Sequence, residues 1–254
     1  MKQTERIKHL VFCSILFSLE IIILLLTYFY SLFYYQLNWL SYLWYFVSWW
    51  SVQTDCLILL FALGGLIYFT KLRNCGFVTN RFFILYIVFA ALLTFLFFTL
   101  GTIIGAVTGE KFTGSWHNIA IYWISTTVQH WVCPVIFIIY FCILVEKEFI
   151  NYKDFCLQKL YKFYLHPIFY TIFIAVRQGV LLLTPVDEKL WNYSVPANNY
   201  YVPYFFQDFR HLEYYILYLL VLSIIIALLI TFVVNLNNLL VNRQKIKEMQ
   251  EKIN

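Results

Sequence analysis

Long apolar runs, separated by short polar stretches, dominate the hydropathy pattern of this chain. Each run approaches or exceeds the roughly 20 residues that an α-helix needs to cross a lipid bilayer. The pattern predicts six membrane-spanning helices, over residues 9–35, 47–69, 82–107, 119–144, 166–186 and 213–240. We therefore predict an all-α, polytopic membrane protein with one six-helix domain, residues 1–240, and a charged tail, residues 241–254.

Composition supports this class. Of the 254 residues, 62% are hydrophobic and only 12% are charged, which excludes an ordinary soluble domain. The six cysteines show neither a CxxC metal spacing nor a disulfide framework. The chain also lacks GxSxG, HExxH and phosphate-binding-loop motifs. We expect no metal, no cofactor and no nucleic-acid partner; the expected partners are membrane lipids.

Positive charge decides the predicted orientation. Outside the helices, 14 Lys and Arg residues lie on the side that carries both termini, and 3 lie on the opposite side. Because cytoplasmic loops carry the excess of Lys and Arg, both termini are predicted to be cytoplasmic. The last outer loop, residues 187–212, is rich in aromatic residues and is predicted either to lie on the membrane surface or to fold back as a lid.

The fourth apolar run contains a polar stretch, Ser125–Pro134. Helical spacing places Thr126 one turn before His130 and predicts a hydroxyl–imidazole pair, with Gln129 on the adjacent stripe. Pro134 cannot donate to the carbonyl of His130, so a kink is expected there. Lipid offers these groups no hydrogen bond, and they must face other helices or a wet cavity. The alternative is a histidine that only packs helices together.

Away from the ends of the predicted helices, four acidic or basic side chains lie inside them, each on a different helix: Glu20, Asp55, His130 and Arg177. Counted from the outer helix ends at about 1.5 Å per residue, they lie at similar depths. Because a lone charge is costly in lipid, we predict that the four meet in one polar centre. The alternative is an ion-pair network that only fixes helix packing.

Glycine spacing suggests one close helix contact. Gly101 and Gly105 in the third run form a GxxxG pattern, which allows two helix backbones to approach closely. We predict that another helix packs against this face.

Several motifs occur in a recognisable order. They are Ser51-x-Gln53-Thr54-Asp55, His130-x-x-x-Pro134, Tyr170 followed by Arg177-x-Gly179, and Tyr201-Val202-Pro203-Tyr204-Phe205. From about residue 40 to residue 240, the chain resembles the androgen-induced/FAR-17a-like transmembrane family. It is most similar to the bacterial Pr6Pr-type membrane proteins, which include an uncharacterised mollicute group.

The resemblance implies a location, the plasma membrane of a bacterium, and an activity. Eukaryotic members of that family are intramembrane hydrolases of fatty acid esters of hydroxy fatty acids, with a threonine nucleophile and a histidine. His130 matches the family histidine, while Ser51, with Thr54 one turn on, stands near the position of the nucleophile. The chain is thus expected to hydrolyse long-chain lipid esters by a hydroxyl that His130 activates. The side chains expected to line the polar centre and orient the substrate are Glu20, Gln53, Asp55, Thr126, Gln129, Tyr170 and Arg177.

Two other functions stay open at this point. The ionisable residues in the helices also suit a small transporter, a proton-coupled carrier or a ligand-binding membrane protein. A structural membrane protein is the third hypothesis.

Overall fold

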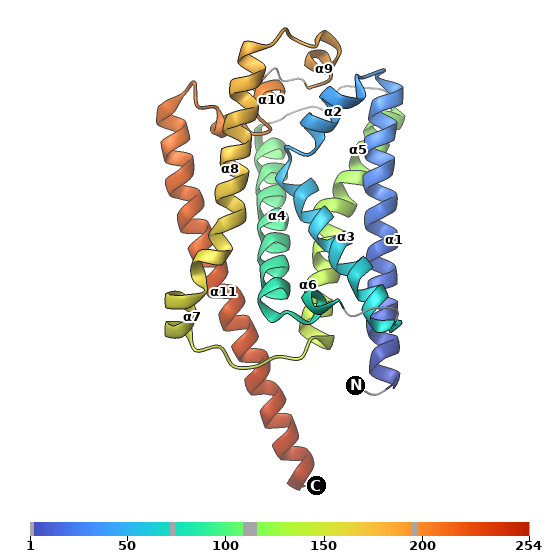
Figure 1. Cartoon of the computed structure of the whole chain (residues 1–254), viewed down its shortest axis with the longest axis vertical. Coiled ribbons are helices and arrows are strands. Elements are labelled where there is room, and N and C mark those ends of the chain that lie inside the picture. The colour runs from blue at the N-terminus through green and yellow to red at the C-terminus, as the bar shows by residue number, and fades with distance from the viewer. Residues whose placement is uncertain (1–2, 72–74, 109–115, 195–197, 254) are drawn as a thin grey trace.

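The computed structural model describes residues 3–71, 75–108, 116–194 and 198–253. Every secondary-structure element within these ranges is helical. Six helices are long and apolar enough to cross a membrane, which confirms the predicted six-helix architecture of a multi-pass membrane protein. The long helices stand side by side, and α1 begins at the same end of the bundle at which α11 ends (Figure 1).

The helices follow the predicted apolar runs closely. The first half of the chain forms α1 (Gln3–Tyr34), α2 (Trp39–Phe46), α3 (Trp50–Phe69), the 3₁₀ turn η1 (Gly76–Thr79) and α4 (Arg81–Thr108). The fourth run forms α5 (Trp116–Thr127), the π-helical turn η2 (Val128–Val132) and α6 (Cys133–Leu144). The rest forms α7 (Tyr152–Gln158), α8 (Leu160–Leu183), α9 (Glu188–Tyr193), α10 (Asn198–Tyr201), the 3₁₀ turn η3 (Phe205–Gln207) and α11 (Leu212–Ile253).

Two helices begin earlier than predicted. Helix α1 starts at Gln3 instead of residue 9, and helix α8 starts at Leu160 instead of residue 166, with Pro167 inside it. The charged tail continues α11 as a helix as far as Ile253, because its polar residues, unlike Pro or Gly, do not interrupt a helix in water. In Figure 1, the end of α11 extends beyond the rest of the bundle.

The tightest described helix contact lies between α1 and α3. A Cβ atom built on Gly65 would lie 2.5 Å from Sγ of the fully buried Cys13 on α1. A Cβ atom on Gly64 would lie 2.2 Å from Cζ of Phe77. At Gly101, by contrast, no described atom comes within 4 Å. Gly101 thus packs against no described atom, and the surroundings of Gly105 lie outside the described residues; adjacent glycines on α3 serve a close approach.

The loop between α8 and α11 folds back onto the bundle. We call residues 187–211 the cap segment, of which 195–197 lie outside the described residues. Its helices α9 and α10 lie at the same end as α2 (Figure 1). Apolar side chains from α9, α10, α2 and the turn before α2 form one buried cluster: Leu37, Tyr42, Tyr45, Leu190 and Tyr200. The loop was predicted either to lie on the membrane surface or to fold back as a lid. This packing favours a loop that folds back over the helices.

Candidate functional site

The polar stretch of the fourth run contains a π-helical turn. In η2, the backbone N–H of Cys133 donates to the carbonyl of Val128, five residues earlier. Pro134 follows as the second residue of α6 and has no N–H for the His130 carbonyl, so a regular α-helical bond cannot form there. The predicted kink thus takes the form of a π turn, a feature that occurs often at functional sites. This turn packs against α1, α3 and α4.

His130 lies in the π turn with a defined tautomer. Its Nδ1 is 2.8 Å from the carbonyl oxygen of Thr126. Because a carbonyl oxygen can only accept, Nδ1 donates and Nε2 carries the lone pair. The imidazole also stacks on Phe98 of α4, with ring centroids 4.3 Å apart. The predicted partner on Thr126 is corrected: the backbone carbonyl, not the hydroxyl, holds the imidazole.

Thr54 faces α4 close to His130. The Thr94 hydroxyl on α4 donates to Thr54 Oγ1 over 3.1 Å, and Thr54 donates to the carbonyl of Trp50 over 3.1 Å. Thr94 precedes Phe98 by one helical turn. Thr54 and His130 therefore lie along one face of α4, one turn apart. Among the described residues, no hydrogen bond joins His130 to Thr54 or Ser51.

Ser51 lies in the first turn of α3 and is buried. N–H groups in the first turn of a helix have no partners within the helix. The N-cap residue Trp49 provides no side-chain hydrogen bond to them. The N–H groups at the positive end of the helix dipole therefore have no side-chain cap. They favour a negative charge on an oxygen atom beside Ser51.

Glu20 and Asp55 form a second polar group between α1 and α3. Both side chains are fully buried, on two helices that pack against each other. The Cys133 thiol lies against the Glu20 carboxyl. No N–H or O–H group of the described residues donates to the four carboxyl oxygens. Gln129 is also buried, and its Nε2 has no described acceptor.

Arg177 has partners other than the predicted ones. Its guanidinium is fully buried and donates from Nη1 to the Tyr201 carbonyl (2.7 Å) and from Nη2 to the Tyr200 carbonyl (2.9 Å). Tyr45 adds a cation–π contact at 5.7 Å. These carbonyls form the negative C-terminal end of α10, which packs on α8. The prediction that Arg177 meets the acids Glu20 and Asp55 in one polar centre is therefore wrong for the described residues.

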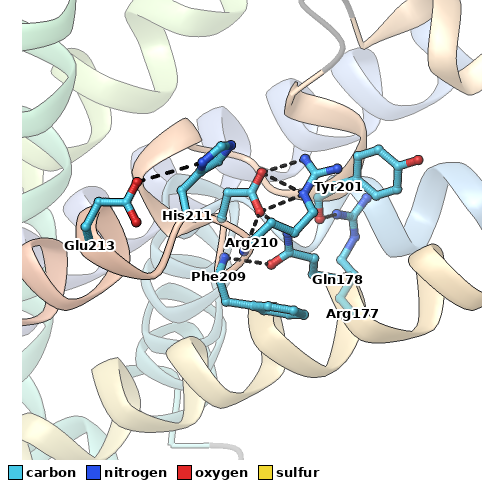
Figure 2. Close-up of polar contacts among 8 residues, drawn as sticks. Arg177, Gln178, Tyr201, Phe209, Arg210, His211 and Glu213 are labelled. Atoms are coloured by element: carbon cyan, nitrogen blue, oxygen red, sulfur yellow. Dashed lines mark hydrogen bonds and ion pairs between the residues drawn. The ribbon is translucent and has the colours of Figure 1, made fainter.

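Next to Arg177, Gln178 joins a network around Asp208 (Figure 2). Gln178 Nε2 donates to Asp208, and its Oε1 accepts the Phe209 N–H over 3.1 Å. Arg210 donates from Nε (2.9 Å) and Nη2 (2.5 Å) to Asp208. Burial alone would raise the pKa of Asp208, but the hydrogen bonds from Arg210 and Gln178 outweigh it and lower that pKa. Sequence reasoning missed Gln178 and Asp208, although an amide beside a membrane arginine was a usable signal.

Gln53 and Tyr170 also lie apart from the acids. His166 Nε2 donates to Gln53 Oε1 over 2.7 Å, and Tyr86 OH donates to the other imidazole nitrogen. Tyr170 donates to the Ser48 carbonyl over 3.0 Å. Both side chains hold the α2–α3 turn against α8. Sequence reasoning read His166 only as part of a helix start, because the Pro after it drew attention to the boundary.

The described residues contain no group of three or more His, Cys, Asp or Glu side chains that could hold a metal ion. The predicted polar centre is instead divided into three parts: the His130–Thr54–Thr94 face of α4, the Glu20–Asp55 pair, and Arg177 with the cap segment. Comparisons with protein-family models, with curated proteins and with solved structures give no match to this chain.

Proposed function

We propose that this protein is an intramembrane hydrolase of long-chain lipid esters in the plasma membrane, with His130 as general base and Ser51 as nucleophile. One observation carries the proposal. The Thr126 carbonyl fixes the proton of His130 on Nδ1, which leaves Nε2 as a base within a membrane-spanning segment. A histidine held by a backbone carbonyl in this way is pre-oriented for proton transfer.

The first turn of α3 supplies the other two requirements of acyl transfer. Ser51 provides a hydroxyl, and the uncapped N–H groups of this turn can stabilise an oxyanion. His130 Nε2 takes the Ser51 proton as Oγ attacks the ester carbonyl. The leaving alkoxide then receives that proton, and water hydrolyses the acyl-enzyme in the reverse sense. Thr54 is the second candidate nucleophile, because it shares a face of α4 with His130.

The substrate class follows from the site and the resemblance together. The candidate residues lie in helices that span the membrane, so a substrate dissolved in the bilayer reaches them without crossing water. The androgen-induced/FAR-17a-like family, which the motifs resemble, acts on long-chain esters. We propose the same chemical class here.

A serine-directed probe tests the proposal. Purified protein in lipid vesicles is incubated with a fluorophosphonate and, separately, with a long-chain fluorogenic ester. We expect covalent labelling and turnover in the parent, and loss of both in His130→Ala and Ser51→Ala. If Ser51 is the nucleophile, Thr54→Val should still be labelled. If Thr54→Val loses the label and Ser51→Ala keeps it, Thr54 is the nucleophile.

Matched controls separate chemistry from folding. Ser223→Ala and His211→Ala remove the same groups at exposed positions on α11 and the cap segment. Both variants should react with the fluorophosphonate and hydrolyse the ester as the parent does. A parent that neither labels nor hydrolyses the ester, with the His130 and Ser51 variants indistinguishable from it, would refute the hydrolase.

A further inference from the structure

The carboxyl groups of Glu20 and Asp55 are a feature that the proposed hydrolysis does not use. They are fully buried on two membrane-spanning helices, α1 and α3, which pack tightly against each other. The salt bridges of the described residues involve neither acid. The buried arginine that could have neutralised them, Arg177, is bound to α10.

Among the described residues, the titratable groups near the pair carry no positive charge. On α6, the Cys133 thiol lies against Glu20. On α3, the Cys56 thiol lies within electrostatic range of both acids. From η2, His130 turns its imidazole to Phe98 of α4 and donates its Nδ1 proton to its own helix. Thiols do not neutralise a carboxylate, so no described side chain balances a negative charge on the pair.

A separate buried side chain, Gln129, lies in the same region. Gln129 is 5% exposed, and its Nε2 has no described acceptor. It precedes Cys133 by four residues, a spacing that places both on one face of the η2–α6 segment. Because Cys133 contacts Glu20, that face is the one turned to the acids. An unsatisfied amide and two unsatisfied carboxyls thus share one dry region, where each costs free energy.

We propose that Glu20 and Asp55 form a proton-binding site inside the membrane, at which the pair holds at least one exchangeable proton. Two carboxylates that are fully buried without donors, on two helices that pack together, cannot both stay ionised in a low-dielectric region without a cation. A proton is the cation that needs no further ligands and no cavity. The pair titrates as a unit.

The apolar reagent dicyclohexylcarbodiimide tests this proposal, because it reaches carboxyl groups from the lipid and reacts with their protonated form. The carboxyl oxygen adds to the carbodiimide carbon, the proton moves to nitrogen, and the adduct rearranges to a stable N-acylurea without a leaving group. For the full chain in lipid vesicles, we expect one adduct per chain, mapped by peptide mass spectrometry to Glu20 or Asp55. Labelling should fall as the pH rises.

Isosteric variants and infrared spectra complete the test. Glu20→Gln with Asp55→Asn should abolish the adduct and the carbonyl stretch of a protonated carboxyl; Glu148→Gln, a change at an exposed acid, should alter neither. The infrared spectrum detects a protonated carboxyl group even where the carbodiimide cannot reach it. Identical infrared spectra of the parent and the double variant, or an unlabelled parent, overturn the proposal. Suppression of labelling by Na⁺ or K⁺ at fixed pH also overturns it and assigns a metal cation. None of these readouts depends on ester hydrolysis.

Discussion

Arg177 donates from Nη1 to the carbonyl oxygen of Tyr201 over 2.7 Å and thereby joins a membrane-spanning helix to the cap segment. The residue lies at the depth where a lone charge is costly, and it is stabilised by carbonyl groups at the end of α10 instead of an acid. Hydrogen bonds with a charged donor are among the stronger ones in proteins. This contact therefore determines how firmly the cap segment is held.

Arg177→Met should loosen the cap segment, because it keeps the bulk of the side chain but removes both hydrogen bonds to α10. We expect a loss of about 1.5–3 kcal/mol in the free energy of unfolding. Thermal unfolding in detergent measures the loss of stability. Limited proteolysis between residues 187 and 211 measures how far the cap segment is released. Arg243→Met, at an exposed position near the end of α11, is the control and should leave both unchanged.

Asp208 should make stability depend on acid pH. Its folded-state pKa is lowered, so its contribution is present above the unfolded pKa of about 3.9 and is lost as the pH falls through the folded value. The parent's unfolding midpoint should drop below about pH 4, and Asp208→Asn should flatten that part of the curve. Asp154→Asn, at an exposed position on α7, should keep the parent's slope. Parallel curves for the parent and Asp208→Asn would contradict the assignment.

Gly65→Ala should force α1 and α3 apart, because the added Cβ would lie 2.5 Å from Sγ of the buried Cys13. Overpacking of this kind costs about 1–3 kcal/mol and exceeds the gain in helix propensity. Adding Cys13→Ala should restore part of the lost thermal stability, which a double-mutant cycle measures. Gly179→Ala, where no described atom lies within 4 Å, is the control and should stabilise the protein or leave it unchanged.

The charge asymmetry predicts the orientation. Reporter fusions at residues 75, 155 and 254 should report the cytoplasm, and a fusion at residue 192 the exterior. An exterior signal at residue 155 would contradict this topology.

The apolar runs by themselves determined the number of membrane-spanning helices and most of their boundaries. Bilayer thickness fixes how many apolar residues a helix needs, and that quantity is readable along the chain. The predicted start of α8, residue 166, is too late: a proline usually marks a helix boundary, but seven helical residues precede Pro167.

Only the tertiary structure decided which polar side chains meet. Counting residues along a helix gives the depth of a side chain in the membrane. The rotation of the helix about its axis and the identity of its neighbours decide which other side chains it contacts. Arg177 and Asp55 were predicted at one depth, yet Arg177 donates to the carbonyl groups of α10, while Asp55 is buried on α3, which packs against α1. Likewise, the π turn before Pro134 sets the direction of His130, and helical spacing alone had assigned it to the wrong oxygen of Thr126. Polar contacts inside a membrane depend on packing between distant segments, which a single hydropathy pattern does not encode.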